Sequence, residues 1–156
     1  MTSALQLIEQ IRTALADDAA ITAWCTEQFG KAQTVFIDVD EQHPPDPASD
    51  YPAIVVLGLG QVRGDSQREI SWELEIGVGV VNEEIVSAGN TRIMTGFCQA
   101  ETLRELAEDA IYRAGIGGVT TRAESGSASF FPLFISGSVI PITQLKPNRR
   151  AMPGRT

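Results

Sequence analysis

Residues 68–82 read REISWELEIGVGVVN, and this stretch decides the fold. Every second residue is apolar, while polar or small residues occupy most of the positions between them. A period of two predicts a long amphipathic strand of an antiparallel sheet, because successive side chains of a strand point to opposite faces. Glu73 and Glu75 fall on the other face, so this face is expected to be wet over the first half of the strand.

The residues before this strand predict its partners in the sheet. The continuous apolar run at 52–59 is typical of a buried strand, and the connection at 60–67 makes the two strands a hairpin. The β-branched and aromatic residues at 34–37 predict an earlier strand. The loop at 38–50 between them carries five acidic residues and three prolines and is expected to be polar and stiff.

Two helices are predicted before the sheet. The segment 4–16 has apolar residues at helical spacing, with Ser3 as the N-cap; the apolar residues are Leu5, Ile8, Ile11 and Leu15. The segment 18–29 is a second short helix, and Gly30 is placed for a left-handed C-cap. Its apolar face is Ile21, Trp24, Cys25 and Phe29. The apolar faces of both helices are expected to pack on a sheet.

After the long strand, the period becomes helical from about residue 90 to 114, and Gly115 ends the helix. The predicted apolar stripe is Ile93, Phe97, Ala100, Leu103, Ala107, Ile111 and Ala114. A strand is expected at 117–122, a Ser-rich turn at 124–129 and a last strand at 130–145. Because proline removes a donor from the ladder, Pro132 and Pro141 predict that the last strand is an edge strand or bulged.

This element order predicts a single α+β domain at 1–145. We expect one small antiparallel or mixed sheet with the helices packed mainly on one face, followed by a basic, disordered tail at 146–156.

The charge distribution excludes one class of function. The chain carries a formal net charge of −8, and four basic residues but no acidic ones lie in the last 11 positions. The other 145 residues, with eight basic and all 20 acidic side chains, carry −12. Such a body repels phosphate and offers no concentrated basic face, so sequence-specific DNA binding is not expected.

The cysteines and the amino terminus bear on the compartment. Cys25 and Cys98 each fall in a predicted helix, and we interpret them as small buried hydrophobic residues in a reducing compartment. The first residues lack the positive charge and unbroken apolar run of a secretory signal. No apolar stretch is longer than 52–60, half of what a membrane span requires, so a soluble protein is expected.

The strongest indication of an enzyme is TVFIDVD at 34–40. It resembles the apolar strand and Asp-x-Asp with which haloacid-dehalogenase-type phosphotransferases begin, which would make Asp38 the nucleophile and Asp40 the general acid. That family has Thr or Val where this chain has Gln42. A small phosphoryl-transfer or metal-dependent enzyme therefore stays an alternative, and it predicts magnesium binding and loss of activity in Asp38→Asn.

Other chemical sites lack their signatures. Asp38, Asp40 and Glu41, with His43 nearby, offer hard ligands for a divalent cation, but Pro44 and Pro45 oppose a compact loop around one. His43 is the only histidine, and the glycines at 58–64 do not complete a dinucleotide fingerprint. We therefore predict no catalytic residue, no cofactor and no metal ligand.

The sequence also resembles a known family in its element order. The predicted order is an N-terminal helix, an acidic loop, Tyr51-Pro-Ala-Ile-Val-Val leading into a long Glu- and Val-rich strand, one long helix and a closing strand. This order resembles that of the tail terminator and tail-completion proteins of long-tailed phages and prophages, including lambda-like and Mu-like minor tail proteins. The resemblance implies a non-enzymatic virion assembly protein, a hexameric ring that caps or joins the tail tube. A prophage-derived binding adaptor or assembly chaperone of the same fold is a further alternative.

The resemblance also implies partners and surfaces. The partners are further copies of the chain, the tail tube and head–tail connector proteins, with DNA only as passing cargo and no membrane. The protein would act in the cytoplasm of the bacterial host during assembly and in the virion tail. The candidate interface residues are Phe130, Phe131, Lys146, Arg149 and Arg150. The candidate acidic channel or surface residues are Glu73, Glu75, Asp38, Asp40 and Glu41.

Overall fold

The computed structural model describes residues 3–62, 69–116, 118–119 and 124–145. These residues form the predicted α+β fold, with the three predicted helices and with eight strands where five were predicted. In chain order the elements are α1 (Ala4–Ala16), α2 (Ala19–Phe29), β1 (Thr34–Ile37), β2 (Ala53–Val62), β3 (Glu69–Val81), β4 (Ile85–Ala88), β5 (Thr91–Met94), α3 (Thr95–Arg113), β6 (Gly118–Val119), β7 (Glu124–Phe130) and β8 (Leu133–Leu145).

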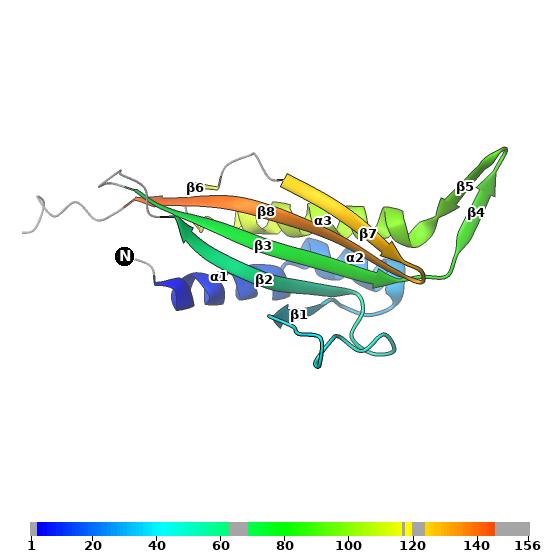
Figure 1. The fold of residues 1–156 in the computed structure, drawn as a ribbon, viewed down its shortest axis with the longest axis horizontal. Coiled ribbons are helices and arrows are strands. Elements are labelled where there is room, and N and C mark those ends of the chain that lie inside the picture. Colours follow the sequence, from blue (N-terminus) through cyan, green and yellow to red (C-terminus); the bar gives the residue numbers. More distant parts are fainter. Residues whose placement is uncertain (1–2, 63–68, 117, 120–123, 146–156) are drawn as a thin grey trace, which may run out of the picture.

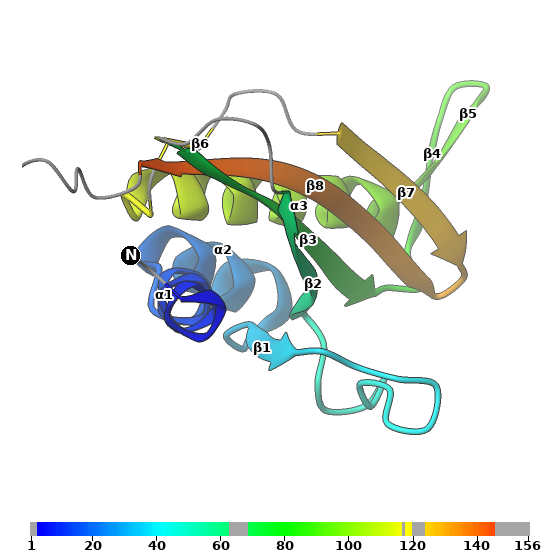
Figure 2. The same ribbon diagram turned by 60° about the vertical axis from the view of Figure 1, so that its left-hand side comes forward.

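The main sheet is mixed and covered on one face. Its strands run in the order β1-β2-β3-β8, and both β6 and β7 pair with the far edge of β8. The pair β1 and β2 is parallel, while every other described pair in this sheet is antiparallel. Figures 1 and 2 show the helices on the same side of the sheet. No helix formed by the described residues lies on the opposite side, which we call the outer face.

The alternation in β3 produces the core. Its even-numbered residues from Ile70 to Val80 are all buried and face the helices. They meet every second residue of β8, such as Phe134 and Ile140, and the buried face of α3, including Leu103 and Ile111. The hairpin of β2 and β3 is present as predicted, and β2 extends to Val62, beyond the predicted end.

The first two helices begin and end where the sequence predicts. The Ser3 hydroxyl accepts a hydrogen bond from the Gln6 backbone N–H, and Gly30 closes α2 in the left-handed region at φ 72°. The predicted stripe of α1 is partly wrong, because Leu5 is 71% exposed. Its buried residues are Leu7, Ile11 and Leu15, spaced four apart.

The third helix begins later than predicted. Residues expected in its first turn form β5, which pairs with β4 in a separate two-stranded hairpin. Gly89 makes the turn at φ 60°. The β-branched Thr91 and Ile93 favour a strand once a partner lies beside them. Ile93 and Phe97, predicted to be core residues of the helix, are therefore exposed, and Ala114 is exposed as well.

The carboxy-terminal third contains two further corrections. The predicted Ser-rich turn at 124–129 is strand β7, antiparallel to β8. As a result β8 lies between β3 and β7, so the prediction of an edge strand is wrong. Pro141 is tolerated because it lies between the stretch of β8 that pairs with β7 and the stretch that pairs with β6.

Some predictions lie outside the described residues. These are the turn at 63–67, most of the strand predicted at 117–122 and the basic tail at 146–156. In the described part of the chain, no helix has the length and apolar character to cross a membrane.

Candidate functional site

Exposed apolar side chains gather at one end of the molecule. Ten large hydrophobic side chains are exposed among the described residues, and seven of them come from β4, β5, the start of α3 and the turn between β7 and β8. The backbone N–H of Asn82 donates to the carbonyl of Pro132 at 3.0 Å, which joins the base of the β4–β5 hairpin to that turn. We call the seven the apolar end: Ile85, Val86, Ile93, Met94, Phe97, Phe130 and Phe131.

The β4–β5 hairpin, which we call the arm, projects from this end of the sheet (Figures 1 and 2). Ile85 pairs with Met94, and the neighbouring pair is Val86 with Ile93. Adjacent pairs point to opposite faces of a hairpin, so both faces of the arm are apolar near its base. All four side chains are between 40% and 49% exposed.

The base of the arm is firmly attached to the body. The Thr95 backbone N–H donates to the Glu84 carbonyl at 3.1 Å, and the Thr95 hydroxyl donates to Glu84 Oε1 at 3.0 Å. The Asn82 side-chain amide donates to Gln99 Oε1 at 2.8 Å. The arm therefore has a fixed base and two uncovered strands.

The outer face of the sheet carries three exposed carboxylates. Glu73 and Glu75 lie on this face of β3, because the residues between and beside them point into the core. Val139 of β8 pairs with Glu75 on one side and with Glu124 of β7 on the other, which puts all three side chains on the same face. None of the three acids forms an ion pair with a described residue. We call Glu73, Glu75 and Glu124 the acidic band.

Next to the acidic band the outer face has three adjacent glycines, and the side chain of Leu57 covers one of them, Gly77. Gly77, Gly137 and Gly126 lie side by side on three neighbouring strands, two residues along from the acids. A side chain at Gly126 would meet no atom within 4 Å, whereas at Gly77 it would meet Leu57 at 3.1 Å. We call these three residues the glycine strip.

Beyond the glycine strip the outer face is apolar. The ring of Tyr51 lies against Gly79, where an added Cβ would come within 2.6 Å of it. Burial, with the charge of Asp50 as the second cause, raises the pKa of the Tyr51 phenol. Phe130 pairs with Leu133 on this face, so the apolar part of the outer face runs into the apolar end.

The three loop acids predicted as channel or surface residues, Asp38, Asp40 and Glu41, are exposed and do not join the acidic band. Asp40 Oδ1 accepts from the His43 ring Nδ1 at 2.9 Å and from the backbone N–H groups of Gln42 and His43. These bonds, the one from the His43 ring first, lower the pKa of Asp40. Asp38 donates its backbone N–H to the Val56 carbonyl, and Glu41 forms no ion pair with a described residue.

A buried charge cluster joins α3 to β8. Arg104 binds Glu108 at 2.6 Å and Glu101 at 2.9 Å, and its Nε donates to the Ser136 hydroxyl at 3.0 Å. The Ser138 hydroxyl donates to Glu108. Desolvation is the largest influence and lowers the pKa of Arg104, but the hydrogen bonds and charges of the two glutamates together raise it. The charged and hydroxyl groups of this cluster bind one another within the chain, so the cluster holds α3 on the sheet.

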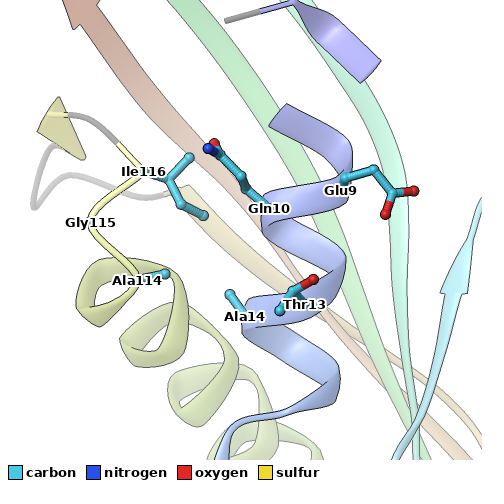
Figure 3. Close-up of a pocket in the computed structure, with 7 residues that line it drawn as sticks. All are labelled: Glu9, Gln10, Thr13, Ala14, Ala114, Gly115 and Ile116. Carbon is cyan, nitrogen blue, oxygen red and sulfur yellow. The ribbon is translucent and has the colours of Figure 1, made fainter. Parts of the chain in front are cut away.

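An open depression of about 420 Å³ lies between α1 and the end of α3 (Figure 3). Ala14, Ala114 and Ile116 line it with apolar groups. Its one carboxylate, Glu9, points away from Ile116 and is paired with Arg12 at 2.7 Å. Thr13 contributes a hydroxyl, and Glu9 is the one titratable side chain among the lining residues.

The cysteines and acids give no sign of a metal centre in the part of the chain that the structure describes. There, no group of three or more His, Cys, Asp or Glu side chains is placed to hold an ion. Cys25 is buried, and this burial raises its pKa to about 11. Cys98 is exposed, so the prediction that it is a buried hydrophobic residue is wrong. Both thiols are free.

The structure brings together only part of the predicted surface. Phe130 and Phe131 belong to the apolar end, while Lys146, Arg149 and Arg150 lie outside the described residues. The arm was missed by the sequence analysis, although Gly89-Asn90 between two short apolar pairs is a hairpin signal. Glu124 was missed because its segment was interpreted as a turn.

Comparisons with known proteins indicate no function for this chain. No protein-family model matches the sequence, and no curated protein matches it.

Proposed function

We propose that this protein is a structural virion assembly protein, which forms a homo-oligomeric ring that caps or joins the tail tube of a long-tailed phage or prophage. It acts without catalysis, during assembly in the bacterial cytoplasm and then in the virion tail. Its other partners are the tail tube and the head–tail connector proteins. The observation that carries this proposal is the apolar end, where seven large hydrophobic side chains are exposed together. Such a patch is typical of a protein–protein interface.

The charge of the chain is consistent with a channel through which DNA passes. The exposed acids Asp38, Asp40 and Glu41 belong to a body that carries −12 outside its tail. A channel lined by like charge does not hold phosphate, so DNA moves through it without binding.

The test is the absolute mass in solution, measured by light scattering over a concentration series, with negative-stain imaging of any large species. A hexamer of the 16.8 kDa chain has a mass of about 100 kDa and should show a central hole. The same measurement is repeated with purified tail tube protein added, because a tail-capping ring can require its tube. A protein that stays monomeric in both series contradicts the proposal.

A further inference from the structure

We propose that the arm of one copy of this chain packs on the outer face of the sheet of the next copy. In this arrangement Ile85 and Met94 lie over the glycine strip. Arg92 lies between Glu75 and Glu124. The inference rests on the proposed function, because it names a second copy of the chain as the occupant of the outer face.

The arm needs a partner to be stable. An isolated two-stranded hairpin is marginal in water, and this one has large apolar side chains on both faces. In both views the arm projects away from the body of its own chain (Figures 1 and 2). The described part of its own body therefore leaves these side chains 40% to 49% exposed, and a partner surface can bury the remainder.

The spacing of the arm matches the spacing of the outer face. Ser87 pairs with Arg92, so this pair lies on the same face of the arm as Ile85 and Met94, two residues along. On the outer face, Glu75 and Glu124 follow the glycine strip by two residues as well. Two residues of strand span about 7 Å in both cases. When Arg92 lies between Glu75 and Glu124, Ile85 and Met94 therefore lie over the glycine strip.

The charges of the two surfaces are complementary. Arg92 is the only charged side chain of β4 and β5, and it forms no ion pair within the described part of the chain. Glu75 and Glu124 are two strands apart, about 10 Å, with Val139 between them. A guanidinium above Val139 faces both carboxylates and offsets part of the repulsion between two acidic bodies. Glu73 and the loop acids remain for the channel.

The glycine strip favours close packing of the arm on the outer face. Sheets that pack face to face normally lie about 10 Å apart, a distance set by the side chains between them. At Gly137 and Gly126 the sheet contributes no side chain, so Ile85 and Met94 can fill the space there, beside the Leu57 side chain that lies over Gly77. The arm and the outer face are different surfaces of one chain, and such a heterologous contact generates a ring when the rotation between successive copies closes.

The first test reverses the charges. Arg92→Glu should weaken assembly about a hundredfold or more, because it places three acids together, and the double variant Glu75→Lys with Glu124→Lys should do the same. Combining all three substitutions should restore the mass of the wild-type protein. Arg12→Glu on the far helix is the matched control and should leave the mass unchanged. Light scattering measures assembly, and circular dichroism checks that each variant is folded.

The second test is a disulfide between copies. In a Cys98→Ser background, Met94→Cys with Gly126→Cys should give a ladder of disulfide-linked oligomers on a non-reducing gel, since the space at Gly126 is open. Leu5→Cys with Gly126→Cys is the control and should give none, because Leu5 is an exposed residue of α1.

The outcomes separate this inference from the proposed function. A wild-type ring that is unaffected by the reversals, or that gives no ladder, overturns the inference alone. A monomer, with and without tube, contradicts the proposed function and the inference with it. Replacement of Lys146, Arg149 and Arg150 by Glu tests whether the basic tail, rather than the arm, occupies the outer face. If those replacements dissociate the ring and Arg92→Glu does not, the tail covers the acidic band and the inference is wrong.

Discussion

At the scale of single residues, Arg104 shows how an ion pair can hold an element in place. Its guanidinium is enclosed between α3 and β8 and binds two glutamates and a buried serine. Glu101 and Glu108 do not belong to the apolar stripe that the sequence predicts for this helix. They nevertheless reach the sheet, because Ser136 and Ser138 replace apolar residues on the facing strand.

Removal of this charge should be costly. Arg104→Met leaves two carboxylates without their cation, and we expect a loss of about 3 kcal/mol in the free energy of unfolding at neutral pH. Urea unfolding at neutral pH measures this loss.

The control for this prediction is another helical arginine. Arg12 pairs with Glu9 in solvent, so Arg12→Met should leave the unfolding midpoint unchanged. Adding Glu101→Gln and Glu108→Gln to Arg104→Met should recover part of the stability. If Arg104→Met and Arg12→Met lose the same free energy of unfolding, burial of the cluster contributes nothing to stability.

At the scale of elements, the arm and β7 are strands that local preference alone does not specify. Strand β7 is exposed along its whole length and consists mostly of serine, glycine and alanine. It is a strand because β8 supplies a complete set of backbone partners. The arm likewise depends on partners outside itself, and its fixed base keeps it available for one.

The arm should therefore be protected only in the assembly. In hydrogen exchange followed by mass spectrometry, amides of residues 85–94 should exchange slowly in the assembled wild-type protein and fast in dissociated Arg92→Glu. Peptides from the middle of β3 provide the internal control and should be equally protected in both samples. Fast exchange in the arm of the assembled protein would mean that nothing covers it.

At the scale of the whole molecule, the attraction between apolar surfaces has to exceed the repulsion between acidic chains. Each copy carries a net charge of −8, so the copies in the proposed ring would repel one another. Salt screens this long-range repulsion but has little effect on a pair that is buried in the contact. The apolar contribution does not depend on screening.

Assembly should consequently strengthen with salt. We expect the apparent association constant to rise as sodium chloride increases from roughly 0.05 to 0.5 M, a range over which the screening length falls severalfold. Light scattering at fixed protein concentration measures the change. A constant that falls instead would indicate that exposed ion pairs, such as those of the basic tail, hold the copies together.

The sequence alone determined the α+β class, the long central strand, the caps of the first two helices and the acidic character of the body. These properties depend on local periodicity, on single capping residues such as Ser3 and Gly30, and on charge, all of which are visible without a partner strand. Only the tertiary structure decided the arm, the internal position of β8 and the enclosure of Arg104. The internal position of β8 and the enclosure of Arg104 depend on residues far along the chain, whereas the arm depends on the pairing of two short neighbouring segments. In each case the partner outweighs the weak preference of a short segment.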